Sequence, residues 1–136
     1  MALPTIYPAL RYQDARAALK WLIDAFGLTE HMVVEGPDGA IHHAELAWGD
    51  GGMIMLGSTS DGNDGRLADP TGPVWLYLVV DDPDGHHDRA VAAGAEIVQP
   101  LTDEDYGSRG YTARDPEGNL WSFGTYQPAE SAESAT

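Results

Sequence analysis

Two side chains that could carry acid–base chemistry, His43 and Glu45, stand two positions apart in the chain. They belong to residues 41–48, where apolar and polar residues alternate and so predict a β-strand. Because successive side chains of a strand point to opposite faces, His43 and Glu45 share one face and His42 points away from it. An imidazole beside a carboxylate can form an acid–base pair or supply two ligands to a metal ion. The sequence shows no third ligand, so a polar strand surface or a dimer surface is the competing interpretation.

Arginines are the next candidates, because the chain has only seven Lys and Arg against 22 Asp and Glu. Arg109 lies in the stretch Tyr106-Gly107-Ser108-Arg109-Gly110, whose glycines allow a ligand or a partner chain to come close. Arg109, like Arg11, could hold a carboxylate or a phenolate through paired hydrogen bonds. Ion pairs with the many acidic residues are the alternative for these arginines.

The formal net charge of −15 excludes some classes of partner. Nucleic acids and anionic membrane surfaces both need a basic surface, so neither is an expected partner. An acidic field attracts cationic small molecules, although acidity can also serve solubility alone. The chain has no cysteine, which removes disulfides, thiolate nucleophiles and zinc–thiolate sites. With no apolar run long enough for a membrane helix and no visible secretory signal, we expect a cytoplasmic protein.

The elements that would position these residues follow one pattern twice: strand, helix, and three strands. The first helix is predicted over residues 15–26, between an N-cap at Asp14 and a C-cap at Gly27. The second is predicted from Pro83 to a stop at Gly94. We expect Val91 and Ala95 on its buried side, and His86 and His87 in solvent. The predicted strands cover residues 5–12, 29–35, 41–48, 53–56, 74–80, 95–101, 111–114 and 120–123.

This order of elements indicates an internal duplication. Placing Asp82 on Asp14 aligns Trp75 with Tyr7. Matching the turn glycines Gly52 and Gly118 aligns Leu56 with Ser122. Between the halves, residues 58–72 are rich in Gly, Asp, Asn and Pro, which predicts an exposed and mobile loop.

Four stretches carry a resemblance to a known family: Leu10-Arg11-Tyr12-Gln13-Asp14, Phe26-Gly27-Leu28, Val80-Asp81-Asp82-Pro83 and Asp115-Pro116-Glu117-Gly118-Asn119-Leu120-Trp121. With them the chain resembles the vicinal oxygen chelate superfamily, which includes glyoxalase I, extradiol dioxygenases and bleomycin-resistance proteins. The resemblance implies an α+β fold of two tandem βαβββ modules, a curled mixed sheet or open barrel around a cleft. It also implies a homodimer. Within a single domain of residues 1–136, module one would span about 4–57, a linker loop 58–72, module two about 73–127 and a disordered tail 128–136.

The resemblance also implies where metal ligands would stand, on the first and last strands of each module. The corresponding residues here are Tyr7, Leu56, Trp75 and Ser122. Leucine and tryptophan offer no lone pair for coordination, and neutral tyrosine and serine are poor ligands for a divalent metal. The sequence therefore predicts no metal site and no cofactor.

Strand alternation predicts what lines the cleft instead. If Tyr7 and Trp75 face it, then Arg11, Tyr77 and Ser122 face it too. Trp121 and Phe123 would pack against the helices. Such an aromatic lining suits a planar or cationic organic ligand. The predicted ligand-binding residues are Tyr7, Arg11, Leu56, Trp75, Tyr77, Tyr106, Arg109 and Ser122.

These observations predict a metal-free protein of the bleomycin-resistance type. It would sequester an aromatic or cationic small organic molecule, with an antibiotic among the candidates. The alternative is a lyase, isomerase or dioxygenase of the same superfamily that uses His43 and Glu45 with an atypical metal site or none. A third interpretation is a collapsed cleft and a role in partner interaction.

Overall fold

The computed structural model describes residues 3–69, 72–105 and 107–128. The chain divides into two compact units, unit 1 from Met1 to Gly72 and unit 2 from Pro73 to Thr136.

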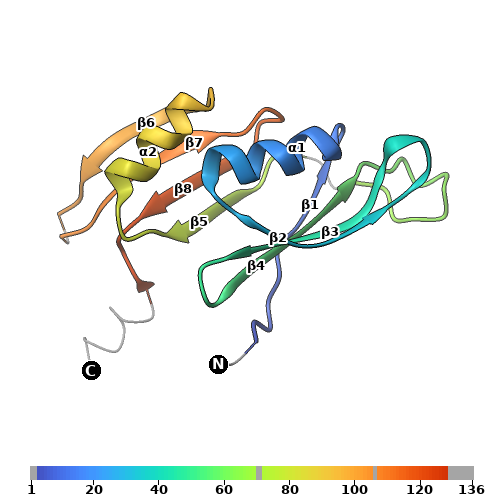
Figure 1. The fold of residues 1–136 in the computed structure, drawn as a ribbon, viewed down its shortest axis with the longest axis horizontal. Coiled ribbons are helices and arrows are strands. Elements are labelled where there is room, and N and C mark those ends of the chain that lie inside the picture. Colours follow the sequence, from blue (N-terminus) through green and yellow to red (C-terminus); the bar gives the residue numbers. More distant parts are fainter. Residues whose placement is uncertain (1–2, 70–71, 106, 129–136) are drawn as a thin grey trace. The chain divides into compact units, whose positions relative to one another are not determined.

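Unit 1 is one βαβββ module (Figure 1). Strand β1 leads into helix α1, which ends in a π-helical turn, and three strands follow. The sheet order is β1-β4-β3-β2, with β1 parallel to β4 and the other neighbours antiparallel. The bounds are β1 Ala9–Tyr12, α1 Ala15–Trp21, the π-helical turn Leu22–Phe26, β2 Thr29–Glu35, a 3-10 turn Pro37–Gly39, β3 Ile41–Trp48 and β4 Gly52–Ser58.

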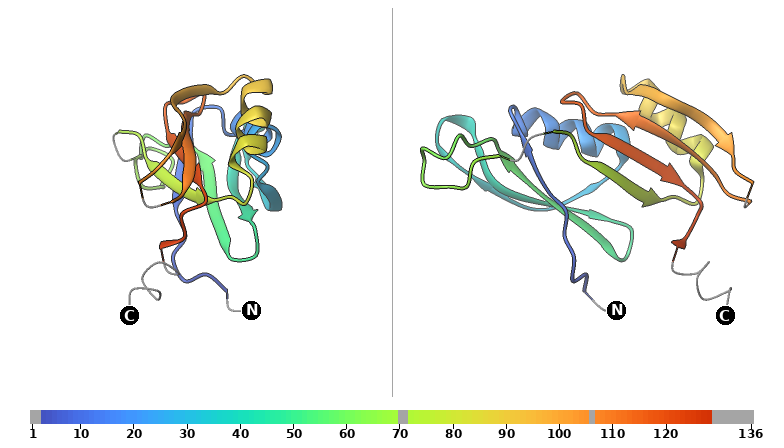
Figure 2. Two further views of the ribbon diagram at one scale, coloured as in Figure 1. Left: turned by 90° about the vertical axis from the view of Figure 1, so that its left-hand side faces the viewer. Right: turned by 180° about the vertical axis from the view of Figure 1, so that it is seen from behind.

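Unit 2 repeats the plan with sheet order β5-β8-β7-β6, where β5 is parallel to β8. Helix α2 lies against one face of this sheet (Figure 2). The bounds are β5 Trp75–Val79, α2 Pro83–Ala92, β6 Glu96–Asp103, β7 Arg109–Arg114 and β8 Leu120–Gly124. The predicted α+β fold of two βαβββ modules is confirmed. Each module has a four-stranded mixed sheet, and over the described residues neither sheet closes into a barrel.

The helix ends follow the predicted capping chemistry. The Asp14 carboxylate accepts a hydrogen bond from the Ala17 backbone N–H at 3.1 Å, which satisfies one of the free donors of the first turn. Gly27 ends the first helical segment with φ of 82°, a left-handed conformation that costs glycine little. The Asp82 carboxylate accepts from the Gly85 N–H in the same way at the start of α2.

The buried face of α2 differs from the prediction. Val91 is 48% exposed, whereas Ala90 is fully buried. The inward face therefore runs through Pro83, His86 and Ala90, at spacings of three and four residues that share one side of a helix. The prediction that His86 lies in solvent is wrong. Its ring packs on Phe123, with the ring centroids 4.1 Å apart.

The alignment of the two last strands is also corrected. Leu56 pairs with Leu10 in unit 1, and Phe123 pairs with Leu78 in unit 2. All four of these side chains are buried, so Leu56 corresponds to Phe123. Met55 is then the counterpart of Ser122. The shift arises because Gly52 already belongs to β4, whereas Gly118 still belongs to the turn before β8.

That turn before β8 is organised by Asp115, whose side chain is buried. Its carboxylate accepts hydrogen bonds from the Glu117 and Asn119 backbone N–H groups, the Asn119 side-chain amide and the Trp121 indole, at 2.9 to 3.1 Å. Gly118 has φ of 96°, the left-handed conformation that a glycine at this turn position permits. The Asn119 side-chain oxygen accepts from the Val74 N–H at 3.0 Å and so fixes the residue before β5.

The loop after β4 has internal structure as far as Asp69. The Asp69 carboxylate accepts from the Ser60 N–H, and the Ser60 hydroxyl donates to Asp64 at 2.8 Å. Hydrogen bonds from the Arg66 backbone N–H, the Ser60 hydroxyl and the Arg66 guanidinium lower the pKa of Asp64 to about 2. Most residues in the described part of this loop are exposed, as predicted, although Ser60 is buried and hydrogen bonds within the loop hold it.

Candidate functional site

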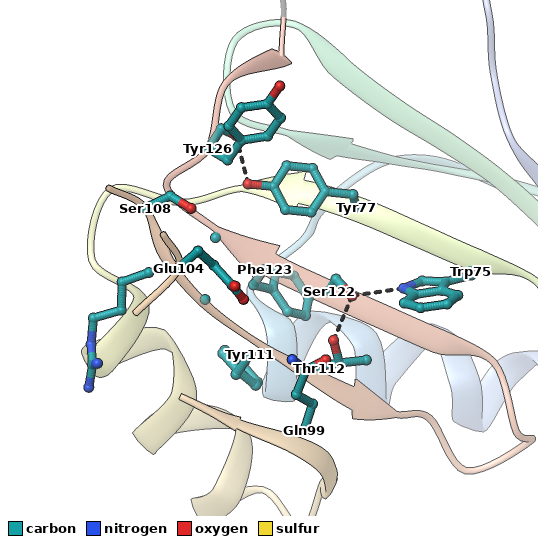
Figure 3. Close-up of a pocket in the computed structure, with 13 residues that line it drawn as sticks. Trp75, Tyr77, Gln99, Glu104, Ser108, Tyr111, Thr112, Ser122, Phe123 and Tyr126 are labelled. Atoms are coloured by element: carbon teal, nitrogen blue, oxygen red, sulfur yellow. Dashed lines mark hydrogen bonds between the residues drawn. The ribbon is translucent and has the colours of Figure 1, made fainter. Parts of the chain in front are cut away.

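A hollow of about 170 Å³ lies on the sheet of unit 2 (Figure 3). Ser122 and Thr112 are directly opposite each other on neighbouring strands and share one face of the sheet. The adjacent Trp121 and Phe123 are fully buried on the other face, toward α2. Side chains that line the hollow include Trp75, Tyr77, Gln99, Glu104, Thr112 and Ser122.

Three side chains form a hydrogen-bonded row across strands β5, β8 and β7. The Trp75 indole Nε1 donates to Ser122 Oγ at 2.8 Å, and Ser122 Oγ lies 2.7 Å from Thr112 Oγ1 (Figure 3). The two hydroxyls carry two O–H groups, and the bond between them uses one. One O–H therefore remains available to an acceptor on a bound molecule.

Aromatic rings give the hollow its apolar surface. Trp75 is 66% exposed and Tyr77 is 43% exposed, which is unusual for large aromatic side chains in a folded domain. The Tyr77 hydroxyl donates to the Tyr126 carbonyl at 2.6 Å, which orients the ring. A Cβ atom at Gly124 would come within 3.0 Å of the Tyr77 hydroxyl, so glycine leaves the space that this tyrosine occupies.

The buried Tyr111 and the half-buried His86 form a pair behind the aromatic surface. The Tyr111 hydroxyl is 2.6 Å from His86 Nδ1, and the Tyr111 ring stacks on Phe123 with centroids 5.5 Å apart. Burial raises the pKa of Tyr111 above its ordinary value. The sequence did not single out this pair, although the spacing of His86 from the apolar Pro83 and Ala90 would have placed it on the inner side of α2.

Arg109 lines the hollow, but its guanidinium is held by carboxylates. Nε donates to Asp84 at 2.7 Å and Nη1 donates to Asp103 at 3.1 Å. The hydrogen bond with Asp84 is the main cause of a raised pKa at Arg109, and the same bond lowers the pKa of Asp84. This is the ion-pair alternative that the acidic composition suggested. The neighbouring ligand candidate Tyr106 lies outside the described residues.

Other residues of the hollow were not found from the sequence. Gln99 is on β6, Glu104 and Ser108 are on the turn that follows it, and Tyr126 comes after β8. The strand pairing brings Gln99 opposite Thr112. A prediction that β6 and β7 pair across the 104–108 turn would have pointed to Gln99 and Glu104.

Unit 1 has a different surface on its sheet. A hollow of about 210 Å³ is lined by Arg11, His43, Met55 and Arg66, among others. Arg11 Nη1 donates to Asp69 at 3.3 Å, so this arginine ties β1 to the loop after β4. The predicted positions Tyr7 and Leu56 differ from each other: Tyr7 is half-buried ahead of β1, whereas Leu56 is only 3% exposed and packs in the core.

His43 and Glu45 meet as the strand pattern predicted. His43 Nε2 is 2.8 Å from Glu45 Oε2, and both side chains remain partly accessible. His31, from the neighbouring strand β2, reaches within 3.8 Å of the other Glu45 oxygen. Across residues 3–69, 72–105 and 107–128, no three His, Asp or Glu side chains come together in a way that could hold a metal ion.

Comparisons with known proteins agree with this fold. Residues 6–123 match the family described as the Glyoxalase/Bleomycin resistance protein/Dioxygenase superfamily. Uncharacterized protein Mb0911c of Mycobacterium bovis is 34% identical over 125 residues, covering 89% of this chain and 82% of that protein. Uncharacterized protein Rv0887c of Mycobacterium tuberculosis is also 34% identical over 125 residues, and the match covers 89% of this chain and 74% of that protein.

Solved structures give the same result. TioX from Micromonospora sp. ML1 superposes with a TM-score of 0.78 at 35% identity, over 91% of this chain and 99% of TioX. Lactoylglutathione lyase from Agrobacterium tumefaciens superposes with a TM-score of 0.64 at 23% identity, over 89% and 93%, which shows a shared fold alone. None of the described helices is long and apolar enough to cross a membrane. The chain belongs to the Glyoxalase/Bleomycin resistance protein/Dioxygenase superfamily.

Proposed function

We propose that this protein binds and sequesters a small aromatic or cationic organic molecule in the unit 2 hollow, without a metal ion. A planar antibiotic is a candidate ligand. The observation that carries the proposal is the row of Trp75, Ser122 and Thr112, in which an exposed aromatic ring is fixed beside a hydroxyl with an unused O–H.

The physical chemistry favours a planar ligand. A ring stacked on Trp75 would cover apolar surface that now faces water, a gain of about 25 cal/mol for each Å² covered. Aromatic pairs in offset or edge contact add about 0.5–1.5 kcal/mol to that burial. The indole is held in place by its bond to Ser122, so the protein loses little side-chain freedom when a ligand binds.

The residues at the expected ligand positions support a site without metal. Trp75 offers no donor atom to a cation, and Ser122 already accepts a hydrogen bond from the Trp75 indole. On the matching strand of unit 1, Met55 supplies a thioether, a soft ligand suited to few metals.

The test is tryptophan fluorescence with two planar probes, quinoline and N-methylquinolinium. We expect each probe to quench the tryptophan emission in a saturable way, with one molecule bound per chain. In Trp75→Phe this quenching should disappear, because the quenched emission comes from Trp75. Trp48→Phe, the same type of substitution in unit 1, should retain the quenching. Quenching that rises linearly with either probe, or persists unchanged in Trp75→Phe, would overturn the proposal.

The expected homodimer is part of the proposal. Sedimentation at increasing protein concentration would show a dimer mass. A monomer mass at every concentration would remove dimerisation and leave the ligand site of unit 2 as proposed.

A second candidate function rests on the contact of 2.8 Å between His43 and Glu45. The carboxylate can orient the imidazole so that His43 moves a proton to or from a substrate, as in a lyase or isomerase of the superfamily. This candidate predicts turnover of a bound compound that His43→Gln abolishes and His42→Gln, on the opposite strand face, preserves. Equal activity in both variants would exclude it, and elemental analysis would show whether any activity follows a bound metal.

A further inference from the structure

Glu104 places a carboxylate beside the aromatic surface of unit 2. It follows β6 and opens a turn that is held by two backbone bonds, from the Glu104 N–H to the Ser108 carbonyl at 2.8 Å and from the Gly107 N–H to the Glu104 carbonyl at 3.0 Å. The Glu104 side chain is half-buried and lines the hollow together with Tyr77 and Tyr126. Its carboxylate points toward the hollow (Figure 3).

The charge of this carboxylate is not offset by the cation that lines the same hollow. Arg109 donates to Asp84 and Asp103 and has no bond to Glu104. Within the ranges that the structure describes, no ion pair or side-chain hydrogen bond involves the Glu104 carboxylate. The hollow therefore presents one negative charge that a ligand can satisfy.

The neighbouring rings suit the same kind of ligand. The face of a tyrosine ring carries negative electrostatic potential and attracts a cation within about 6 Å of the ring centre. Tyr77 is 43% exposed, and Tyr126 is partly exposed on the same side. A delocalised organic cation can stack on an aromatic ring and approach a carboxylate at once, whereas a small hydrated metal cation gains nothing from the rings.

We propose that Glu104 makes the unit 2 hollow select a cationic planar ligand over a neutral ligand of the same shape. This inference rests on the proposed function. It adds that the ligand is positively charged and that Glu104 is the residue that recognises this charge. The selectivity is local. The net charge of −15 raises the concentration of every cation near the surface, whereas Glu104 is the one carboxylate among the described residues that line the hollow.

The experiment compares N-methylquinolinium with methylnaphthalene, a neutral hydrocarbon of the same shape, by tryptophan fluorescence titration. We expect the wild-type protein to bind the cation roughly five- to tenfold more tightly, the range for a partly exposed charge pair with cation–π support. Glu104→Gln should lose the share of this preference that the carboxylate supplies and keep only about twofold, the share of the tyrosine rings at the low end of the cation–π range. Asp105→Asn removes the same charge from the next position, which is exposed and does not line the hollow, and should retain the wild-type preference.

The outcomes separate the two proposals. Equal binding of both probes to the wild-type protein, or a preference as strong in Glu104→Gln as in the wild-type protein, would overturn the role of Glu104 and leave the aromatic site intact. If Asp105→Asn lost as much of the preference as Glu104→Gln, the selectivity would come from the general acidic field. That result would also overturn the role of Glu104. Failure of both probes to bind would overturn the proposed function itself. Added salt should weaken binding of the cation and leave methylnaphthalene unaffected.

Discussion

The two units share one fold and differ in the chemistry of equivalent positions. Strand register makes Ala9 the counterpart of Tyr77, Arg11 the counterpart of Val79, and Met55 the counterpart of Ser122. The unit 1 sheet carries the ion pair of Arg11 with Asp69 and the hydrogen bond of His43 with Glu45. The unit 2 sheet carries aromatic rings and hydroxyls around its hollow.

The buried positions, by contrast, remain alike. Leu10 and Leu56 pair in the core of unit 1, and Leu78 and Phe123 pair in the core of unit 2. Burial of these side chains determines which face of each strand turns inward. A βαβββ module therefore keeps its fold through one face of its sheet, while the other face is free to carry different chemistry.

The largest expected difference concerns the turns before the last strands. Asp115→Ala would leave four hydrogen-bond donors without their acceptor, in a place where the carboxylate is buried, and should lower the free energy of unfolding by about 3 kcal/mol. The equivalent turn of unit 1 contains the exposed Asp50, and Asp50→Ala should cost less than about 0.5 kcal/mol. Urea unfolding of both variants measures the difference. Equal losses would show that the two turns stabilise their units equally.

The second difference concerns a matched pair of glycines, Gly57 and Gly124. A Cβ at Gly57 would lie 3.1 Å from the His42 carbonyl oxygen, so Gly57→Ala should cost about 1–2 kcal/mol of stability. A Cβ at Gly124 would lie 3.0 Å from the Tyr77 hydroxyl, the end of a side chain, and 3.3 Å from the Arg109 carbonyl oxygen, a looser backbone contact than the one at Gly57. Gly124→Ala should therefore weaken N-methylquinolinium binding more than it lowers stability. The reverse pattern would contradict this assignment.

The third prediction concerns the response of unit 2 to alkali. Burial raises the pKa of Tyr111 above 10.0, the value expected in the unfolded chain. Its contribution to stability is thus complete below pH 10 and is lost as the pH rises, because the unfolded state then releases a proton that the folded state retains. The loss should reach about 1 kcal/mol half a pH unit above that value. Tyr111→Phe should be less stable at neutral pH and should show a flatter alkaline slope. An unchanged slope would assign the alkaline loss to other groups.

The smallest expected effect tests the hydroxyl of Ser122. Ser122→Ala removes the acceptor of the Trp75 indole and one of the two hydroxyls. Binding of quinoline, whose ring nitrogen accepts hydrogen bonds, should weaken about threefold. Binding of naphthalene, which has no acceptor, should weaken less, because it loses only the fixed orientation of the Trp75 indole. Met55→Ala, at the matched position of unit 1, should affect neither probe, and a threefold loss there would contradict a binding site made by unit 2 alone.

The sequence predicted the fold from local signals. Asp14 and Gly27 act as helix caps, and the alternation in residues 41–48 correctly brought His43 beside Glu45. These features depend on neighbours within a few residues, so a single sequence contains the information. Trp75 and Ser122 were predicted to share a face, and they are joined by a hydrogen bond.

What the sequence missed depends on register and tertiary packing. Leu56 was aligned with Ser122 through the turn glycines, but turns of different length shifted the strand by one residue and so exchanged its faces. His86 is polar by type, yet its ring packs on Phe123 and its Nδ1 lies 2.6 Å from the Tyr111 hydroxyl. Glu104 reaches the hollow only because a turn that pairs with Ser108 brings it there.

The turn at Asp115 has a consequence for how such proteins change their ligands. Asn119 in that turn holds Val74, and the next residue along the chain is Trp75, which forms the most exposed part of the aromatic surface. The turn thus acts as a mount for Trp75: it fixes the backbone just before Trp75 through the bond between Asn119 and Val74, and that bond does not involve the Trp75 side chain. A descendant could replace Trp75 or Ser122 and keep the mount intact. Its ligand would then change without the loss of stability that usually accompanies a new binding site.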